Sequence, residues 1–141
     1  MIRRLKKELD GVVKNYDVEM VDEKIDRWRF ALEGPENSLY DGGVFLVELY
    51  FPPSYPMVAP EVRFLTRIFH PNITSSGKIC LGMLNDWKMN LSVMDVLVEI
   101  KNLLIEPNVS DPLEADVAKL FVSDPTKYNE TVKNWIEKYA S

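Results

Sequence analysis

Residues 44–65 read VFLVELYFPPSYPMVAPEVRFL, two apolar runs separated by a proline-rich break. The first run, 44–51, is long and apolar, as expected for a central strand, and the second predicts another strand at 60–65. The four prolines of this segment make the break stiff and unable to extend a sheet. Met57 and Val58 lie within the break, where they either cover the core or form a pre-ordered apolar docking tip.

Two shorter strands are predicted before this segment. Residues 16–21 alternate in polarity, and residues 27–33 place Trp28, Phe30 and Leu32 on one face, the pattern of a half-buried strand. A turn-forming segment with Asp-Gly-Gly then leads into the long apolar run. Loops this short favour a four-stranded antiparallel meander.

An amphipathic helix is predicted at the N-terminus. Arg3, Arg4 and Lys7 lie on its polar side, with Lys6 near the boundary. This basic face is either a solvated helix surface or a docking face for an acidic partner. The apolar residues of the helix recur at helical spacing and are Ile2, Leu5, Leu9, Val12 and Val13.

Three further helices are predicted after residue 91. Ser92 and Asp95 resemble a capping box, and Glu106 followed by Pro107 ends the first of these helices. Its predicted buried stripe consists of Val93, Val96, Leu97, Ile100, Leu103 and Leu104.

The last two helices are predicted to begin with Asp-Pro. Asp111 is expected to be an N-cap with Pro112 at the first helical position, and Asp124 repeats the pattern. The apolar stripe of the final helix is Tyr128, Val132, Trp135, Ile136 and Tyr139. Strands followed by helices predict an α+β fold, and residues 1–141 suffice for a single domain.

The composition narrows the possible functions. The net charge of −5 disfavours nucleic acid as a main partner. No apolar run reaches the roughly 18 residues needed to span a bilayer, and the charged N-terminus does not resemble a signal peptide. A single cysteine cannot form an internal disulfide. We therefore expect an intracellular protein that does not enter a membrane.

Residues 66–91 show no clean periodicity, and so long a loop in a small domain is usually functional. The loop holds the only histidine, His70, and the only cysteine, Cys80. Two ligands are too few for zinc, so no metal site is expected. The two residues either form a thiol–imidazole dyad, or Cys80 acts alone as a nucleophile that exchanges with a thioester. Lys78 would then lower the pKa of the thiol modestly.

Asn72 is a second candidate in the same loop. Its carboxamide has two N–H donors and no charge, so it suits an oxyanion that forms when an amine attacks a thioester. Asn72 equally suits a structural role in which it braces the loop through backbone hydrogen bonds. The residues alone leave both roles open.

The segment HPNITSSGKICLGML, residues 70–84, resembles the active-site segment of the ubiquitin-conjugating enzymes. In that family His-Pro-Asn is followed, eight residues after the Asn, by the catalytic Cys and then Leu. The likeness extends over nearly the whole chain, through 42–73, 106–121 and 128–140. It implies an N-terminal helix, a four-stranded antiparallel meander, a long active-site loop and three C-terminal helices. It also implies that no cofactor is bound, because ATP is used by the activating enzyme.

The resemblance implies roles for the loop residues. Cys80 would accept ubiquitin as a thioester, and Asn72 would stabilise the oxyanion, order the loop, or both. Asp111 would orient or deprotonate the substrate lysine. The neighbours that would shape the loop without transferring protons are His70, Pro71 and Leu81.

The resemblance also implies partner surfaces, on a protein of the cytoplasm, the nucleus or both. The activating enzyme would dock on Arg3, Arg4, Lys6 and Lys7, with ligases overlapping the same face. RING or HECT ligases would contact Met57 and Trp87. The donor modifier would rest against Asp95, Val98, Glu99 and Asn102.

Several positions depart from the family pattern. Gly82 stands where many members have Asp, and Lys-Met-Asn at 88–90 replaces the more usual Ser-Pro-Ala. Asp-Trp-Lys at 86–88 is similar to the conjugating enzyme for NEDD8, whereas 55–60 is similar to the member that pairs with an inactive variant. The alternatives are therefore another ubiquitin-like modifier such as NEDD8, or a non-catalytic ubiquitin-binding variant. The chain looks like a bare catalytic core, such as one trimmed from a longer protein.

Overall fold

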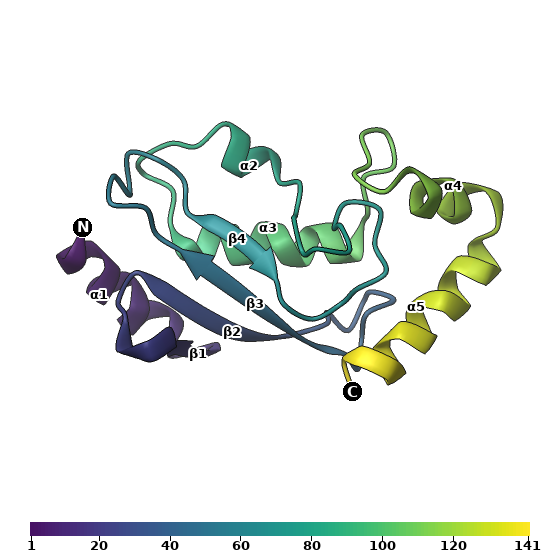
Figure 1. Cartoon of the computed structure of the whole chain (residues 1–141), viewed down its shortest axis with the longest axis horizontal. Coiled ribbons are helices and arrows are strands. Elements are labelled where there is room, and N and C mark those ends of the chain that lie inside the picture. Colours follow the sequence, from purple (N-terminus) through teal and green to yellow (C-terminus); the bar gives the residue numbers. More distant parts are fainter.

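The computed structural model describes residues 1–141, and its elements follow the predicted order (Figure 1). The sheet contains β1 to β4 in sequence order, and every neighbouring pair is antiparallel. The predicted α+β meander, with an N-terminal helix and three C-terminal helices, is confirmed. The elements are α1 (Ile2–Val12), β1 (Asp17–Met20), the 3₁₀ turn η1 (Val21–Glu23), β2 (Arg27–Glu33), β3 (Val44–Tyr50), β4 (Glu61–Phe64), α2 (Gly82–Asn85), α3 (Val93–Ile105), α4 (Ala115–Ser123) and α5 (Pro125–Tyr139).

The core lies between the sheet and α3, which crosses behind the strands in Figure 1. Alternate residues of β2 are buried, and Phe30 aligns with Val47 of β3, which aligns in turn with Phe64 of β4. The predicted stripe of α3 is buried against them, except that Leu103 is only half-buried. The alternate residues of the strands and the apolar stripe of α3 thus form one buried apolar layer.

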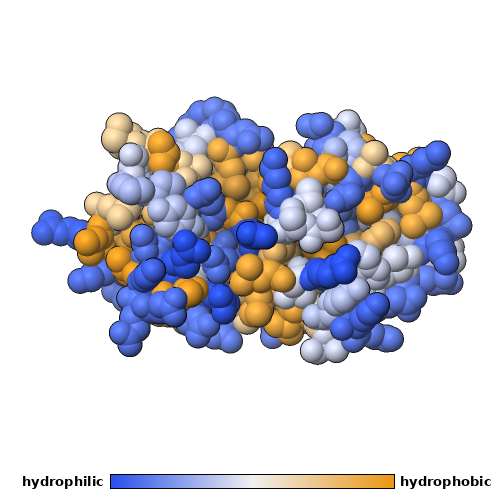
Figure 2. All heavy atoms as spheres, viewed as in Figure 1, coloured by the Kyte–Doolittle hydropathy of each residue, from blue (hydrophilic) through white to orange (hydrophobic).

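The outer face of the sheet carries a row of alternating charge. Glu19, Arg29, Glu48 and Arg63 align across the four strands. Glu48 accepts from Arg29 at 3.4 Å and from Arg27 at 2.8 Å. Figure 2, in the orientation of Figure 1, shows hydrophilic side chains spread among smaller apolar areas on the face that it draws.

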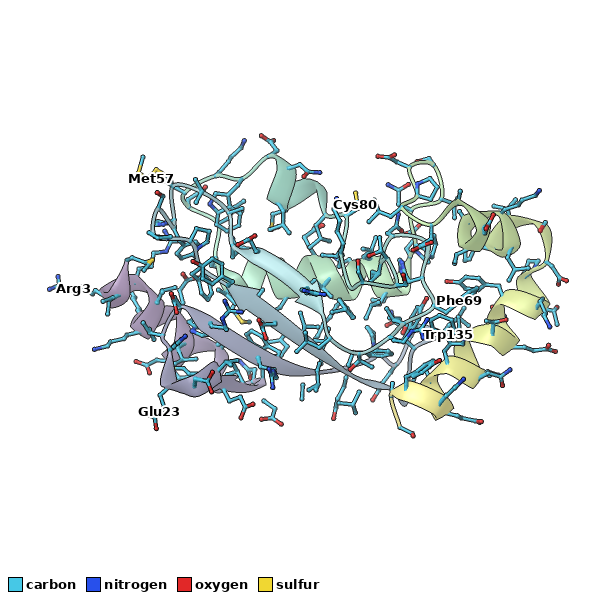
Figure 3. All side chains as sticks on the ribbon, in the orientation of Figure 1. Arg3, Glu23, Met57, Phe69, Cys80 and Trp135 are labelled. Carbon is cyan, nitrogen blue, oxygen red and sulfur yellow. The ribbon has the colours of Figure 1, made fainter.

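The last helix, α5, is anchored by aromatic side chains. Asp124 caps it by accepting from the Lys127 N–H at 3.1 Å, as predicted. Phe69 and Trp135 point toward one another (Figure 3), with ring centroids 5.2 Å apart. The buried Tyr128 hydroxyl lies 2.9 Å from that of Tyr40, and burial raises the pKa of Tyr128 to about 12. These contacts tie α5 to Phe69, which precedes His70, and to Tyr40 in the connection between β2 and β3.

Two predictions about helix ends are wrong. Ile2 and Val13 were expected in the buried stripe of α1, yet they are 55% and 50% exposed, and Leu5 and Val12 are the residues of α1 that are buried. Asp111 is not a helix N-cap, because α4 begins at Ala115. The backbone N–H groups of Leu113 and Glu114 donate to the carbonyl of Pro71, so tertiary contacts replace the cap.

The long segment 66–91 is more ordered than its sequence suggests. Isolated bridges pair Arg63 with Lys78 and Ile73 with both His70 and Ile79. Gly77 closes the turn at φ +90°, where a Cβ would lie 2.0 Å from the Phe64 carbonyl oxygen. None of the helices is long and apolar enough to cross a lipid bilayer.

Candidate active site

Cys80 lies between the bridged turn and the short helix α2, at the edge of the molecule in Figure 3. Its side chain is half-buried, and its N–H donates to the Asn72 carbonyl at 3.1 Å. The thiol borders a groove of about 640 Å³. The groove is lined by Asn72, Cys80, Leu81, Gly82, Asn85, Glu99, Asn102, Leu103, Glu106, Pro107, Asn108, Val109, Ser110 and Asp111.

Three carboxylates and no basic side chain line this groove. Glu99 and Glu106 come from α3 and its C-cap, and the exposed Asp111 comes from the segment before α4. The groove therefore attracts a cation such as a lysine ammonium. The chain contains no cluster of residues that could hold a metal ion.

Asn72 is 1% exposed and braces the active-site loop. Its Nδ2 donates to the Asn108 carbonyl at 2.8 Å and, more weakly, to the Asp111 carbonyl at 3.4 Å. Its Oδ1 accepts from the Asn108 N–H at 2.9 Å. In this conformation the side chain holds residues 108–111 against the loop, which is the structural role considered from the sequence.

His70 is also a loop brace, and the thiol–imidazole dyad is wrong for this structure. Its Nδ1 accepts from the Asn72 N–H at 3.0 Å, so its Nε2–H donates to the Leu103 carbonyl at 2.8 Å. Burial lowers the pKa of the imidazole to about 4. Both nitrogens of the neutral ring are bound to backbone groups, which leaves none to accept the Cys80 proton. Pro71 and Leu81 are also buried, as expected for residues that shape the loop.

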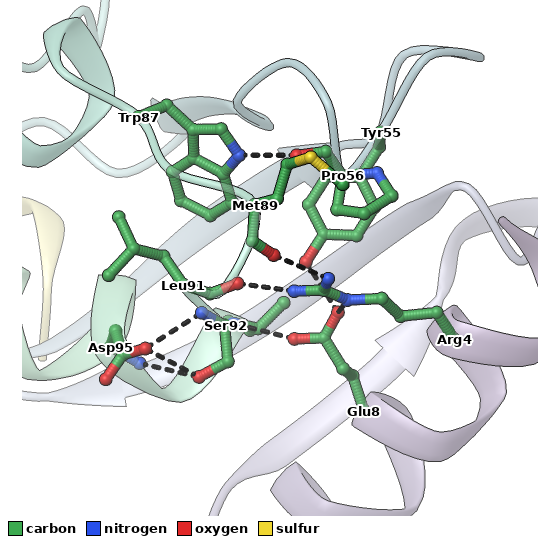
Figure 4. Close-up of polar contacts among 10 residues, drawn as sticks. Arg4, Glu8, Tyr55, Pro56, Trp87, Met89, Leu91, Ser92 and Asp95 are labelled. Atoms are coloured by element: carbon green, nitrogen blue, oxygen red, sulfur yellow. Dashed lines mark hydrogen bonds and ion pairs between the residues drawn. The ribbon is translucent and has the colours of Figure 1, made fainter.

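Arg4, predicted to face an activating enzyme, points inward instead (Figure 4). It donates to the carbonyls of Met89, at 2.7 Å, and of Leu91, and pairs with Glu8 at 3.2 Å. Only Arg3, Lys6 and Lys7 of the predicted basic face remain exposed. A long side chain on the polar side of a helix can still reach a neighbouring loop, which the spacing of charges does not reveal.

Glu8 joins α1 to two other segments, the loop of Tyr55 and the start of α3, and the sequence did not single it out. Its carboxylate has a side-chain exposure of 12% and accepts from Arg4, from the Tyr55 hydroxyl at 2.5 Å and from the Val93 N–H at 2.8 Å. Burial and the hydrogen bond to Glu8 raise the pKa of Tyr55 well above its usual value. We call Glu8, Arg4 and Tyr55 the Glu8 hub.

The two loops held by the Glu8 hub carry exposed methionines. Met57 is 71% exposed, which favours the docking-tip interpretation, and Met89 of the neighbouring loop is 56% exposed. Trp87 was predicted as a contact residue, but it is half-buried and its Nε1–H donates to the Pro56 carbonyl at 2.8 Å. The unusual Lys-Met-Asn at 88–90, where many members of the family that the chain resembles have Ser-Pro-Ala, was the sequence signal that could have identified Met89. Figure 3 shows Arg3 and Met57 projecting outward at the same end of the molecule.

The predicted donor-modifier residues on α3 differ in their availability. Asp95 is committed to the predicted capping box, where its carboxylate accepts from the Ser92 N–H at 2.8 Å. Val98 is 48% exposed, and Glu99 and Asn102 line the Cys80 groove. These three residues therefore remain accessible, whereas Asp95 supports the start of the helix.

Comparison with known proteins identifies the class. The sequence model of a family described as "Ubiquitin-conjugating enzyme" matches residues 3–136. Ubiquitin conjugating enzyme E2 B of Dictyostelium discoideum is 37% identical, over 98% of this chain and 97% of the relative. The solved E2 domain of a Toxoplasma gondii ubiquitin conjugating enzyme is 36% identical, with a TM-score of 0.93 over 99% of this chain and 98% of that one.

The fold and the sequence thus define a transferase of the ubiquitin conjugation pathway. This chain belongs to the ubiquitin-conjugating enzyme family. Both relatives are described as ubiquitin conjugating enzymes, so neither NEDD8 conjugation nor a non-catalytic variant is favoured. The family generally needs no cofactor, and its partners are ubiquitin, activating enzymes and ligases.

Proposed function

We propose that Cys80 accepts ubiquitin from the activating enzyme as a thioester and passes it to a substrate lysine with a RING or HECT ligase. The observation that carries this proposal is the accessible single thiol beside a groove lined by three carboxylates and no cationic side chain. A thiol is nucleophilic near neutral pH, and exchange of one thioester for another needs little acid–base assistance. The proposed setting is the cytoplasm, the nucleus or both.

The transfer step uses the acidic groove. The carboxylate of Asp111 attracts the lysine ammonium and takes its proton, and the neutral amine attacks the thioester carbonyl. An amide bond forms, the bond from the carbonyl carbon to Sγ breaks, and the second proton of the attacking nitrogen passes to the departing sulfur, so that Cys80 leaves as a thiol. Asn72 stabilises the intermediate oxyanion once its Nδ2 releases the long hydrogen bond to the Asp111 carbonyl. The same side chain thus braces the loop before reaction and acts as a donor during it.

Charging of Cys80 is tested by mixing the protein with activating enzyme, ATP and ubiquitin, followed by a non-reducing gel. We expect a thiol-sensitive band shift that Cys80→Ala abolishes. A shift that survives Cys80→Ala, or no shift at all, would contradict the proposal. Repeating the reaction with NEDD8 and its own activating enzyme measures the preference between modifiers.

The role of Asn72 is tested by separating charging from discharge. Asn72→Ala should charge at a nearly normal rate but transfer ubiquitin to free lysine about 10²–10³-fold more slowly, as for a lost oxyanion donor. Asn85→Ala is the matched control, because Asn85 is an exposed asparagine of the same groove. Equal losses in charging and discharge for Asn72→Ala would show that the residue is only a brace.

The ligase surface is proposed to be the pair of loops that carry Met57 and Met89. Both thioether side chains are exposed, and flexible apolar residues suit a docking surface. The activating enzyme is proposed to use Arg3, Lys6 and Lys7, which are exposed on α1. Reversal of charge at Lys6 should slow charging of Cys80, whereas Met57→Ala should slow ligase-dependent discharge alone.

A further inference from the structure

A small basic hollow lies between the end of β4 and the turn at residues 75–76, which precedes Cys80. Its volume is about 180 Å³, and among its lining residues are Arg63, Arg67, Thr66, Ser75 and Ser76. Neither arginine forms an ion pair with any carboxylate of the chain. Glu114 accepts from the Ser75 N–H at 3.3 Å but pairs with neither arginine. Two unpaired guanidinium groups are notable on a chain with a net charge of −5.

Both guanidinium groups are held in place before any ligand binds. Arg67 lies over the rings of Trp135 and Tyr139, each at 5.1 Å from its centroid. Arg63 donates from Nε to the Ser76 carbonyl at 3.0 Å, and no hydrogen bond occupies its two terminal nitrogens. A fixed guanidinium with free terminal N–H groups suits the two oxygens of a carboxylate. Because the side chains are already ordered, binding loses little conformational entropy.

The hollow is close to the reactive thiol. Arg63 pairs with Lys78 in an antiparallel bridge, and Cys80 is two residues further along the chain. Two extended residues span about 7 Å, and the exposed Lys78 adds a third positive charge on the way to the thiol. A ligand bound in the hollow would therefore lie close to the Cys80 thiol, from which ubiquitin is proposed to be transferred.

We propose that this basic hollow binds the carboxylates of an acidic segment in the acceptor protein, close to the lysine that Cys80 modifies. The inference rests on the proposed function and names a class of substrate for it. The acidic groove attracts the lysine, while the basic hollow attracts the acidic residues beside it in the acceptor sequence. A short acidic segment fits better than a long polyanion, which the net negative charge of the chain repels.

The test uses the ubiquitin thioester of Cys80, prepared and then freed of ATP. Two acceptor peptides are compared, one with a lysine beside a short run of glutamates and one with glutamines in their place. We expect a KM about tenfold lower for the acidic peptide, with similar kcat, because ordered Arg–carboxylate pairs contribute to binding and not to chemistry. Raising the salt concentration should remove this preference.

Arg63→Gln should raise the KM for the acidic peptide about fivefold and leave the KM for the glutamine peptide unchanged. Arg67→Gln is a second, independent variant, and thermal unfolding shows whether each variant remains folded. Lys24→Gln is the matched control, because it removes the same charge from an exposed residue remote in sequence from the hollow. Discharge to free lysine should not change in any of the three variants.

The inference is overturned if wild type uses both peptides equally, if Lys24→Gln raises the KM as much as Arg63→Gln, or if only kcat changes. Failure of Cys80 to charge would instead contradict the proposed function. In that event, fluorescence anisotropy with a labelled acidic peptide and the uncharged protein still tests the hollow. Weaker binding to Arg63→Gln than to wild type supports the inference, and equal binding rejects it.

Discussion

His70 is expected to make the folded protein less stable as the pH falls from 7.5 towards 4. Burial lowers the pKa of its imidazole to about 4 in the folded state, compared with the ordinary 6.5 of an unfolded chain. Well above pH 6.5 the ring is neutral in both the folded and the unfolded state, and its full contribution to the free energy of unfolding is present. Between pH 6.5 and 4 only the unfolded chain binds the proton, so stability is lost as the pH falls.

The size of this effect follows from the two pKa values. The difference corresponds to about 3 kcal/mol in the free energy of unfolding once the pH is below 4. About 1 kcal/mol of it should already be lost between pH 7.5 and 5.5. Most carboxylates are still ionised at pH 5.5, given their usual pKa values near 4. The histidine should therefore dominate the slope in this range.

Urea unfolding at pH 7.5, 6.5 and 5.5, followed by tryptophan fluorescence, measures the slope. His70→Gln is the control, because glutamine keeps polar atoms near the two backbone partners but does not titrate. The variant should be less stable than wild type at pH 7.5 and should lack the histidine-dependent part of the slope. The NMR signal of this single histidine should stay constant down to pH 5. Equal slopes in both proteins, or titration of the ring near pH 6.5, would refute the reasoning.

Two further predictions concern residues that hold the fold together. Glu8→Ala removes the acceptor for the Val93 N–H and should lower the free energy of unfolding by about 2–4 kcal/mol in urea titrations, whereas Asp10→Ala, at an exposed position on the same helix, should change it little. Gly77→Ala should destabilise the protein more than Gly42→Ala in thermal unfolding. Both glycines have φ near +90°, but only at Gly77 would the new Cβ collide with backbone. Comparable losses from the two glycine variants would show that the collision is relieved by a small shift.

The strands were predictable because alternation is a local signal. Each predicted strand matches an observed one to within one residue at either end. The capping box at Ser92 and the Asp124 cap were also identified correctly, since a cap depends on residues three positions apart. Strand alternation and helix caps depend on residues close together in the sequence, so they can be predicted without knowledge of the tertiary structure.

The errors share a different cause, which is competition from contacts distant in sequence. Asp111 and Asp124 are each followed by proline, yet only Asp124 caps a helix. The N–H groups that an Asp111 cap would have bound, those of Leu113 and Glu114, donate to the Pro71 carbonyl instead. Arg4 has the helix position of a surface cation but reaches loop carbonyls more than 80 residues away. For Asn72, spacing identified the residue, and only tertiary structure showed its brace role.

In each of the two loops beside the Glu8 hub, one residue anchors the loop to the fold and another faces possible partners. Tyr55 and Trp87 point inward and hold the loops, whereas Met57 and Met89, two residues further along each loop, face solvent. Substitutions at the two methionines can therefore alter what the surface recognises without removing the contacts that fix the backbone. Such an arrangement lets partner choice diverge among related proteins while the inherited framework stays the same.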